Sequence, residues 1–165
     1  MTAGAELKDL LLRPPRLTLA VAESLTGGHL QALIAATPGA SDYFLGGLTA
    51  YTLAQKVRHL GVNRAHAARV DCVSQRVAVE MAQGAMALFG ADVALATTGY
   101  AQVNRAAGVT VPQAWWALCH RRRHGRLQVI SEFVTVPGAG RVAVQARVAA
   151  VALQALVAYL RALRG

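Results

Sequence analysis

The chain has 165 residues, of which 55% are hydrophobic, and its formal net charge at pH 7 is +9. This length is usual for one domain with a sizeable core, so we expect a single domain over residues 1–165. Polar or charged residues interrupt every apolar run before the roughly 20 residues of a membrane span, so we expect no contact with a membrane. Glu6, Lys8 and Asp9 stand where a signal peptide requires apolar residues, which predicts a cytoplasmic protein.

The two cysteines, Cys72 and Cys119, lie far apart and match neither the spacing of a zinc site nor a redox motif. We therefore expect no metal and no other cofactor, and we interpret both cysteines as small buried side chains. The positive charge is compatible with three kinds of partner, which are nucleic acids, acidic proteins and phosphorylated small molecules.

Most cationic residues are scattered, but one group is compact and lies between the apolar runs W-W-A-L-C and L-Q-V-I. It comprises Arg121, Arg122, Arg123, His124 and Arg126. The simplest interpretation is a solvated hairpin turn closed by Gly125. A nucleic-acid contact is the less favoured alternative, because no aromatic residues alternate with the charges as a stacking platform requires.

The first half of the chain alternates short helices and strands. Residues 5–13 form an amphipathic pattern that Pro14 and Pro15 end, and residues 17–22 are typical of a buried strand. A helix is expected at residues 29–36, and a strand with a bulge at Gly46 and Gly47 is expected at residues 43–51. A second helix follows this strand and ends at Gly61.

In the second half, Ser74 is a good N-cap for a helix over residues 75–89, which Gly90 closes. Residues 93–97 indicate a core strand, and residues 112–119 and 127–136 indicate an antiparallel pair. A long helix is expected over residues 141–163. Alternating strands and helices followed by a hairpin predict an α/β fold, a three-layer α/β/α sandwich with a mixed sheet.

Ser24 is the best candidate for a chemical role, because it follows the first predicted strand directly. Ligands of α/β sheets bind at the carboxyl ends of strands. Glycines at the start of the next helix would let the backbone N–H groups of residues 25–28 hold a phosphate or an oxyanion, and we expect these groups to be free. The alternative is that A-E-S-L-T-G-G is merely a capped turn.

A serine hydroxyl needs a neighbouring base to attack an amide. Lys56, five residues after Tyr51, is one of only two lysines, and the helix after the strand would direct it back toward Tyr51. A desolvated lysine can act as a base, and a tyrosine can relay a proton, so we expect Ser24 within hydrogen-bond reach of Lys56 or Tyr51. The alternatives are a solvated helix lysine and a core or rim tyrosine. Glu23 is either a buried partner for a cation or a polar loop residue.

Four segments resemble the C-terminal domain of the competence/damage-inducible protein family, which includes stand-alone nicotinamide-nucleotide amidases. They read T-L-A-V-A-E-S-L-T-G-G, P-G-A-S-D-Y-F-L-G-G-L-T-A-Y-T-L-A-Q-K followed by L-G-V, V-S-Q-R-V-A-V-E-M-A-Q-G-A, and A-L-A-T-T-G. The resemblance implies a similar three-layer sandwich and hydrolysis of nicotinamide mononucleotide to nicotinic acid mononucleotide and ammonia without a metal. It places the catalytic serine, tyrosine and lysine on Ser24, Tyr51 and Lys56. We assign oxyanion or substrate binding to Thr26, Gly27, Gly28, Thr98, Gly99 and Arg141.

The chain also departs from the family pattern. Leu53 replaces an asparagine, and T-G-Y-A-Q-V-N-R-A-A-G replaces a glycine-rich loop. Near the C-terminus Arg141 matches, but Gln145 and Ala146 replace an arginine pair and Arg147 comes one position late.

Three hypotheses follow from this pattern. The first is an amidase for a small nucleotide amide, and the second is a lapsed or repurposed member that binds a nucleotide or protein partner. A nucleic-acid-binding module is the least favoured. The sequence leaves the oligomeric state open, including a homo-oligomer.

Overall fold

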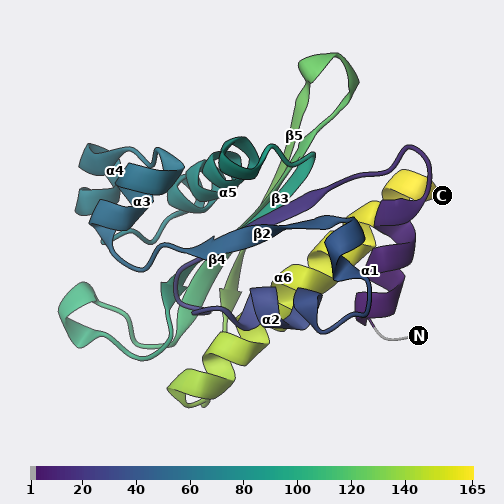
Figure 1. The fold of residues 1–165 in the computed structure, drawn as a ribbon. Helices are drawn as coiled ribbons and strands as arrows, with labels where there is room; N and C mark the ends of the chain where they lie inside the picture. The colour runs from purple at the N-terminus through teal and green to yellow at the C-terminus, as the bar shows by residue number, and fades with distance from the viewer. Residues whose placement is uncertain (1–2) are drawn as a thin grey trace.

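The computed structural model describes residues 3–165 and consists of one mixed sheet with helices on both faces (Figure 1). The strands are β1 (Leu19–Glu23), β2 (Phe44–Thr49), β3 (Val93–Tyr100), β4 (Gln113–Arg121) and β5 (Leu127–Thr135). Their order is β2-β1-β3-β4-β5, in which β1 runs parallel to β2 and β3, while the β3–β4 and β4–β5 pairs are antiparallel. The predicted α/β sandwich with a mixed sheet is confirmed.

Two groups of helices form the outer layers (Figure 1). One layer comprises α1 (Ala3–Leu12), α2 (His29–Ala35) and α6 (Arg141–Arg164), and the other comprises α3 (Leu53–Leu60), α4 (Arg64–Arg69) and α5 (Gln75–Phe89). The short α4 was not predicted. It begins at Asn63, whose side chain accepts a hydrogen bond from the His66 N–H group at 2.9 Å.

Successive residues of a strand point to opposite faces, and here the two faces carry side chains of different size. On β1, Leu19 and Val21 belong to the core beneath α1, α2 and α6, whereas Ala20 and Ala22 belong to the core beneath α5. The alanines leave room for α5 to lie close to the sheet. α3 also lies close to α5. A Cβ atom added to Gly84 of α5 would lie only 2.2 Å from the Leu60 carbonyl oxygen of α3.

The helix-end signals in the sequence were accurate. The Ser74 hydroxyl accepts a hydrogen bond from the Val77 N–H group at 3.2 Å and begins α5. Gly90 and Gly61 end α5 and α3 in the left-handed conformation, with φ angles of 67° and 65°. The bulge predicted near Gly46 is also present, because the pairing of β1 with β2 shifts register between Leu19 and Ala20.

The last helix contradicts the expectation that no segment is apolar enough to span a membrane. α6 has 24 residues, and by length and composition alone it meets the requirement for a membrane span. Its buried residues, among them Val148, Leu153 and Leu156, pack in the core of this domain. Core helices of soluble proteins also meet this composition test, so the packing gives α6 its simplest explanation.

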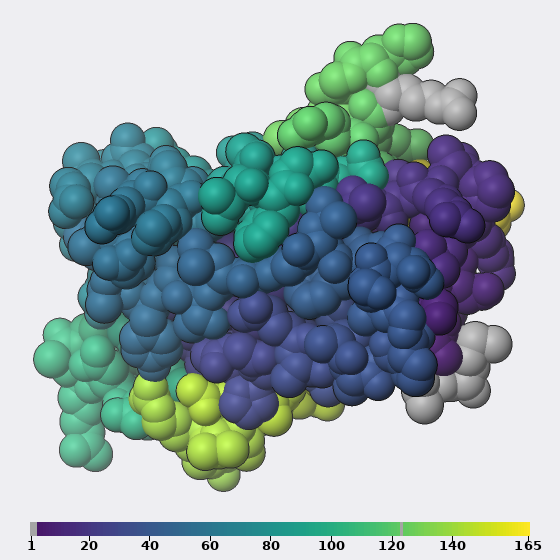
Figure 2. All heavy atoms as spheres, in the orientation of Figure 1, coloured from purple at the N-terminus to yellow at the C-terminus, as the bar shows by residue number. Residues whose placement is uncertain are grey.

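The sheet has two functionally different ends. At one end, the carboxyl termini of the parallel strands β1, β2 and β3 lie together with the loops that follow them. At the other end, the turn between β4 and β5 stands clear of the body of the molecule (Figures 1 and 2). The candidate site lies at the first of these ends.

Candidate active site

A cavity of about 570 Å³ lies at the carboxyl ends of β1, β2 and β3, within the usual size range of small-molecule sites. Ser24 comes from the loop after β1, and Tyr51 and Thr52 come from the segment between β2 and α3. Other lining residues belong to α3, the segment before α5, the end of β3 with its following loop, and α6. They include Leu53, Lys56, Asp71, Cys72, Thr98, Gly99, Tyr100, Gln102 and Arg141.

Lys56 lies beneath this cavity and is only 1% exposed. Its Nζ atom lies 2.9 Å from Ser24 Oγ, 2.8 Å from the Ala50 carbonyl oxygen and 3.1 Å from the Tyr51 carbonyl oxygen. The predicted contact between Ser24 and Lys56 is therefore confirmed. The alternative interpretation of Lys56 as a solvated helix residue is wrong, because the first turn of α3 directs its side chain inward.

The surroundings of Lys56 act on the pKa of its amine in opposite directions. Burial lowers the pKa of the Lys56 amine, and the opposing influence of Cys72 and Asp71 is smaller. In residues 3–165 no carboxylate forms a salt bridge with Lys56. A neutral amine has two N–H groups and one lone pair. As an ammonium, Lys56 donates to both carbonyl oxygens and to Ser24 Oγ. Once it has lost a proton, the two carbonyl oxygens can accept its two N–H groups and its lone pair can face the Ser24 hydroxyl, as a base faces a nucleophile.

Tyr51 and Arg141 lie together at the rim of the cavity. The Tyr51 side chain is 50% exposed, and its hydroxyl accepts a hydrogen bond from Arg141 Nη2. Arg141 Nη1 also donates to Gln102 Oε1 at 3.2 Å. The expected relay from the Tyr51 hydroxyl to Ser24 does not form among the described residues. It is the Tyr51 carbonyl group, and not its phenol, that contacts Lys56.

Glu23 has a role that neither interpretation of the sequence anticipated. Its side chain is 0% exposed, and its carboxylate accepts hydrogen bonds from the N–H groups of Gly28, Leu30 and Gln31 at 2.9–3.0 Å. These are N–H groups at the start of α2, which otherwise lack partners in a helix. Gly28 adopts a φ angle of 104°, which favours glycine, and so lets the chain turn back to the carboxylate.

This cap changes which backbone N–H groups are available to bind an oxyanion. The Gly27 N–H group donates to the Ser24 carbonyl oxygen at 3.1 Å, and the Gly28 N–H group donates to Glu23. The expectation that both are free is therefore wrong. Within the described chain, the N–H groups of Ser24, Leu25 and Thr26 have no protein acceptor, and Leu25 lines the cavity.

The remaining predicted binding residues divide into two kinds. Thr26 is fully buried, and its hydroxyl lies 2.7 Å from the Thr97 hydroxyl, so its side chain fixes the turn to β3. Thr98 and Gly99 line the cavity. The Thr98 hydroxyl donates to the Cys72 carbonyl oxygen at 2.7 Å, and a Cβ atom on Gly99 would lie 2.3 Å from the Gln113 carbonyl oxygen of β4.

Asp71, Cys72 and Tyr100 line the cavity without having been singled out as site residues. Asp71 and Cys72 have φ angles of 48° and 61°, which are uncommon outside glycine. The Tyr100 hydroxyl donates to Asp71 Oδ2 at 2.9 Å, and burial, followed by this carboxylate, raises the Tyr100 pKa to about 12. Cys119 is buried as expected, but Cys72 is only half-buried, because it faces the cavity. The segment V-D-C-V carries no motif that would reveal these contacts.

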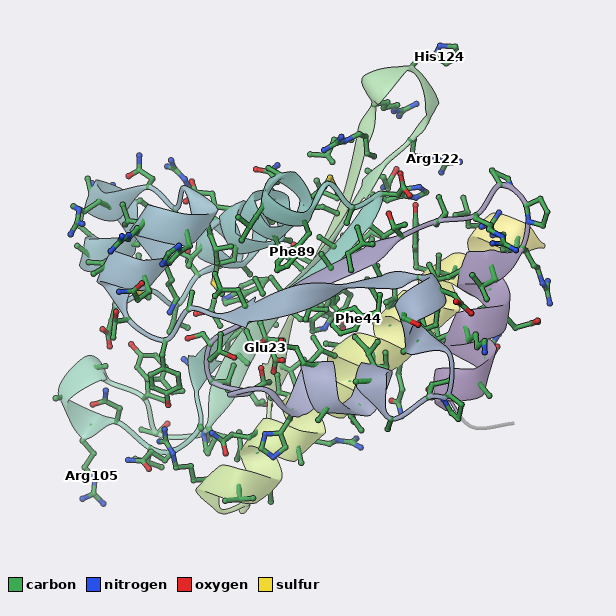
Figure 3. All side chains as sticks on the ribbon, viewed as in Figure 1. Glu23, Phe44, Phe89, Arg105, Arg122 and His124 are labelled. Atoms are coloured by element: carbon green, nitrogen blue, oxygen red, sulfur yellow. The ribbon has the colours of Figure 1, made fainter. Side chains whose placement is uncertain are left out.

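Two further arginines belong to the segments that depart from the family pattern, Arg105 in the loop after β3 and Arg147 in α6. Arg105 projects away from the body at the tip of the loop after β3 (Figure 3), and neither Arg105 nor Arg147 is among the lining residues. Arg141 is therefore the arginine of the described chain that lines the cavity. It is the first residue of α6, whose N-cap residue Gly140 provides no side-chain cap.

The fold and the buried pair of Ser24 and Lys56 define an α/β domain with a serine at the carboxyl edge of its sheet. A sequence model of the CinA C-terminal domain matches residues 3–160, so the chain belongs to this family. A CinA superfamily protein from Klebsiella pneumoniae has a similar structure, with a TM-score of 0.86 and 28% identity over 96% of each chain. A CinA superfamily protein from Escherichia coli gives a TM-score of 0.82 and 30% identity, over 94% of this chain and 89% of that one.

Curated relatives are similar over part of the chain. A CinA-like protein from Picosynechococcus is 52% identical over 91 residues, which cover 55% of this chain and 22% of the relative. A CinA-like protein from Chlorobium limicola is 42% identical over 107 residues, or 65% of this chain and 25% of the relative. The chain thus matches about a quarter of the length of these relatives.

Proposed function

We propose that this domain is an amidohydrolase that converts nicotinamide mononucleotide to nicotinic acid mononucleotide and ammonia. The observation that carries the proposal is the 2.9 Å contact of Ser24 Oγ with Lys56, whose remaining neighbours are carbonyl oxygens. A serine in contact with a neutral amine has the base that amide attack requires. Family membership and the cavity above this pair support the same reaction class.

The first half of the reaction forms an ester on Ser24. As Ser24 Oγ bonds to the amide carbon, its proton passes to Lys56 Nζ and the carbonyl electrons move onto the amide oxygen. The unbonded N–H groups of residues 24–26 are the available donors for this oxyanion. When the C–N bond breaks, the Lys56 ammonium returns a proton to the departing nitrogen, and ammonia leaves.

The second half releases the acid. A water molecule takes the place of ammonia and transfers a proton to Lys56 Nζ as its oxygen bonds to the ester carbon. The bond to Ser24 Oγ then breaks, and Lys56 returns the proton to Ser24. Each step uses only water and groups of this chain.

Arg141 and Tyr51 lie at the rim of the cavity, where the phosphate of a bound nucleotide would extend out of it. Arg141 retains N–H groups beyond its bonds to Tyr51 and Gln102, and the adjacent start of α6 has no side-chain cap. A guanidinium beside an uncapped helix N-terminus suits a phosphate. In this proposal, Arg141 binds the phosphate and Tyr51 orients Arg141, rather than relaying the serine proton.

A second candidate function is binding without turnover, as in a repurposed family member. The hydrogen-bonded pair of Tyr100 and Asp71 favours this alternative, because it places a carboxylate on the wall of the cavity. Leu53 adds an apolar group to the same wall. Such a domain would bind a nucleotide or protein segment but release no ammonia.

Ammonia release from nicotinamide mononucleotide, its riboside and a panel of other amides tests the two candidates. We expect turnover of the nucleotide by the wild-type protein and none above background by Ser24→Ala, with binding of the nucleotide to both by calorimetry. Binding to both proteins without turnover by either would establish the second candidate. Turnover that survives Ser24→Ala would refute the serine mechanism.

A further inference from the structure

A second hollow lies at the opposite end of the sheet from Ser24 and has a volume of about 1040 Å³. One wall is the turn between β4 and β5, and the facing wall is the loop before β1 with the end of α6. Its arginine and histidine lining residues are Arg16, His120, Arg121, Arg122, His124, Arg126 and Arg164. Arg121, Arg122 and Arg126 are exposed in a hairpin turn, as the sequence interpretation predicts, and they line this hollow together with Arg16 and Arg164.

The positive charge of this hollow is not balanced within the described chain. Among the described residues that line it, Asp92 is the only one with a carboxylate, and this carboxylate already accepts hydrogen bonds from the Thr18 N–H group and hydroxyl, each at 2.8 Å. The three salt bridges of residues 3–165 involve other arginines, namely Arg13, Arg76 and Arg161. Cations gathered without counterions repel one another, so this surface favours an anionic ligand.

The arginines of the hollow differ in their availability. The Arg164 side chain donates to the carbonyl oxygens of Leu10 at 3.1 Å and Pro15 at 2.8 Å, so it shapes the wall. Within residues 3–165, the guanidinium groups of Arg16, Arg121 and Arg126 have no hydrogen-bond acceptor, and all three residues are exposed. These three are free to bind a ligand, and they come from both walls.

The shape of this end favours an extended ligand over a compact one. The β4–β5 turn is a two-stranded ribbon that projects beyond the helices, and Figure 3 places His124 at its tip and Arg122 lower on the ribbon. A two-stranded ribbon fits the major groove of a nucleic-acid duplex. No phenylalanine, tyrosine or tryptophan is among the described residues that line the hollow, so it lacks the stacking platform used for single strands.

We propose that this basic hollow and its hairpin bind the sugar–phosphate backbone of a duplex nucleic acid without sequence preference. The hairpin arginines contact phosphates along the groove that the ribbon enters, and Arg16 contacts phosphates at the groove's edge. This site is separate from the Ser24 cavity, with which it shares no lining residue. It therefore does not depend on the proposed amidase activity.

The test compares two triple variants that remove equal charge. Arg121→Gln/Arg122→Gln/Arg126→Gln changes the hairpin, and Arg58→Gln/Arg64→Gln/Arg69→Gln changes exposed residues of α3 and α4. Binding of a short fluorescent duplex is followed by anisotropy between 50 and 200 mM salt. We expect the hairpin variant to reduce the slope of log K against log salt by about 2.7, or about 0.9 per lost phosphate contact. At 0.1 M salt, this equals a loss of about two to three powers of ten in affinity, whereas the α3–α4 variant changes little.

Two competition experiments identify the ligand. We expect an unlabelled duplex to displace the probe at lower phosphate concentrations than single strands or inorganic tripolyphosphate. Equal losses in the two triple variants would show attraction by net charge alone and overturn the proposal. Displacement by tripolyphosphate at equal or lower phosphate concentration would indicate a site for small polyphosphates instead, and would also overturn it.

A folding control accompanies these measurements. Circular dichroism melting establishes that each variant is folded. If the hairpin triple is unfolded, the single variants Arg121→Gln and Arg126→Gln replace it. Each is expected to reduce the salt slope by about 0.9, and an unchanged slope in both would refute the proposed contacts.

Discussion

Two buried ionisable residues, Glu23 and Lys56, lie near the same edge of the sheet, and their surroundings differ in kind. Glu23 is surrounded by three backbone N–H groups, which stabilise a carboxylate. Lys56 is surrounded by two carbonyl oxygens and a hydroxyl, without a carboxylate partner in the described chain. The first residue fixes a turn, whereas the second is poised to exchange a proton. Burial alone therefore does not identify a chemical group, whereas a contact with a nucleophilic hydroxyl at the edge of a cavity indicates one.

The largest expected effect comes from replacing Lys56 by a side chain of similar length that cannot accept a proton. Lys56→Met should lower kcat/KM for ammonia release by about 10²- to 10⁴-fold, because general-base catalysis is lost. The fold should survive, because methionine fills the site without a buried amine. The control is Lys8→Met, which changes the other lysine, a half-buried residue of α1 that donates to the Pro38 carbonyl oxygen. Equal losses in both variants would contradict a special role for Lys56.

Replacing Glu23 should affect stability directly. In Glu23→Gln the three backbone N–H groups keep only a neutral acceptor. The new side-chain NH2 group is buried among donors and has no acceptor there. We expect the free energy of unfolding to fall by about 3 kcal/mol, as measured by urea denaturation. Glu132→Gln, on the exposed strand β5, should change it by less than about 0.5 kcal/mol. A Glu23→Gln protein as stable as the wild type would show that the cap is dispensable.

Arg141 extends the comparison to the substrate, because its charge is exposed and not buried. Arg141→Ala should lower the preference for the nucleotide over its riboside by about 10- to 100-fold in kcat/KM, or roughly 1.5 to 3 kcal/mol. Arg147→Ala provides the control, since Arg147 is exposed on the same helix but does not line the cavity. An unchanged preference in Arg141→Ala would place the phosphate elsewhere.

The smallest effect concerns pH. The Lys56 pKa is below its usual value of 10.5 in the folded protein, so the unfolded chain binds more protons in the interval between the two values. The free energy of unfolding should therefore increase with pH across this interval. In Lys56→Met, the part of this increase that is due to Lys56 should be absent. The kcat/KM profile should rise on its acid side with an apparent pKa below 10.5. A profile that rises only above 10.5 would contradict a neutral Lys56.

Local signals made much of the fold predictable. The N-cap Ser74 and the helix-ending residues Gly61 and Gly90 act within one or two turns of chain, so their positions could be read directly. The contact of Ser24 with Lys56 was also predictable, because Ser24 follows β1, Lys56 lies in the helix after β2, and parallel strands end at the same edge of a sheet. Their catalytic roles remain predictions until activity is measured.

Other parts of the site depend on contacts that spacing does not encode. The Asp71 and Tyr100 side chains meet only because α5 takes the chain to the start of β3 and β3 returns it to the cavity. The Glu23 carboxylate competes for the same N–H groups that glycines would otherwise offer to a ligand, and sequence alone does not decide between these uses. The composition of α6 is ambiguous for a related reason, since the same apolar composition suits a core helix and a membrane span.

The final helix also sets the distance between the two proposed sites. Arg141, its first residue, lines the Ser24 cavity, and Arg164, its last helical residue, lines the basic hollow. With 24 residues at about 1.5 Å each, the helix is roughly 36 Å long. This length is several times the screening distance of about 8 Å at physiological ionic strength. Binding of a ligand at one site therefore leaves the electrostatic potential at the other nearly unchanged, and both ligands can bind at the same time.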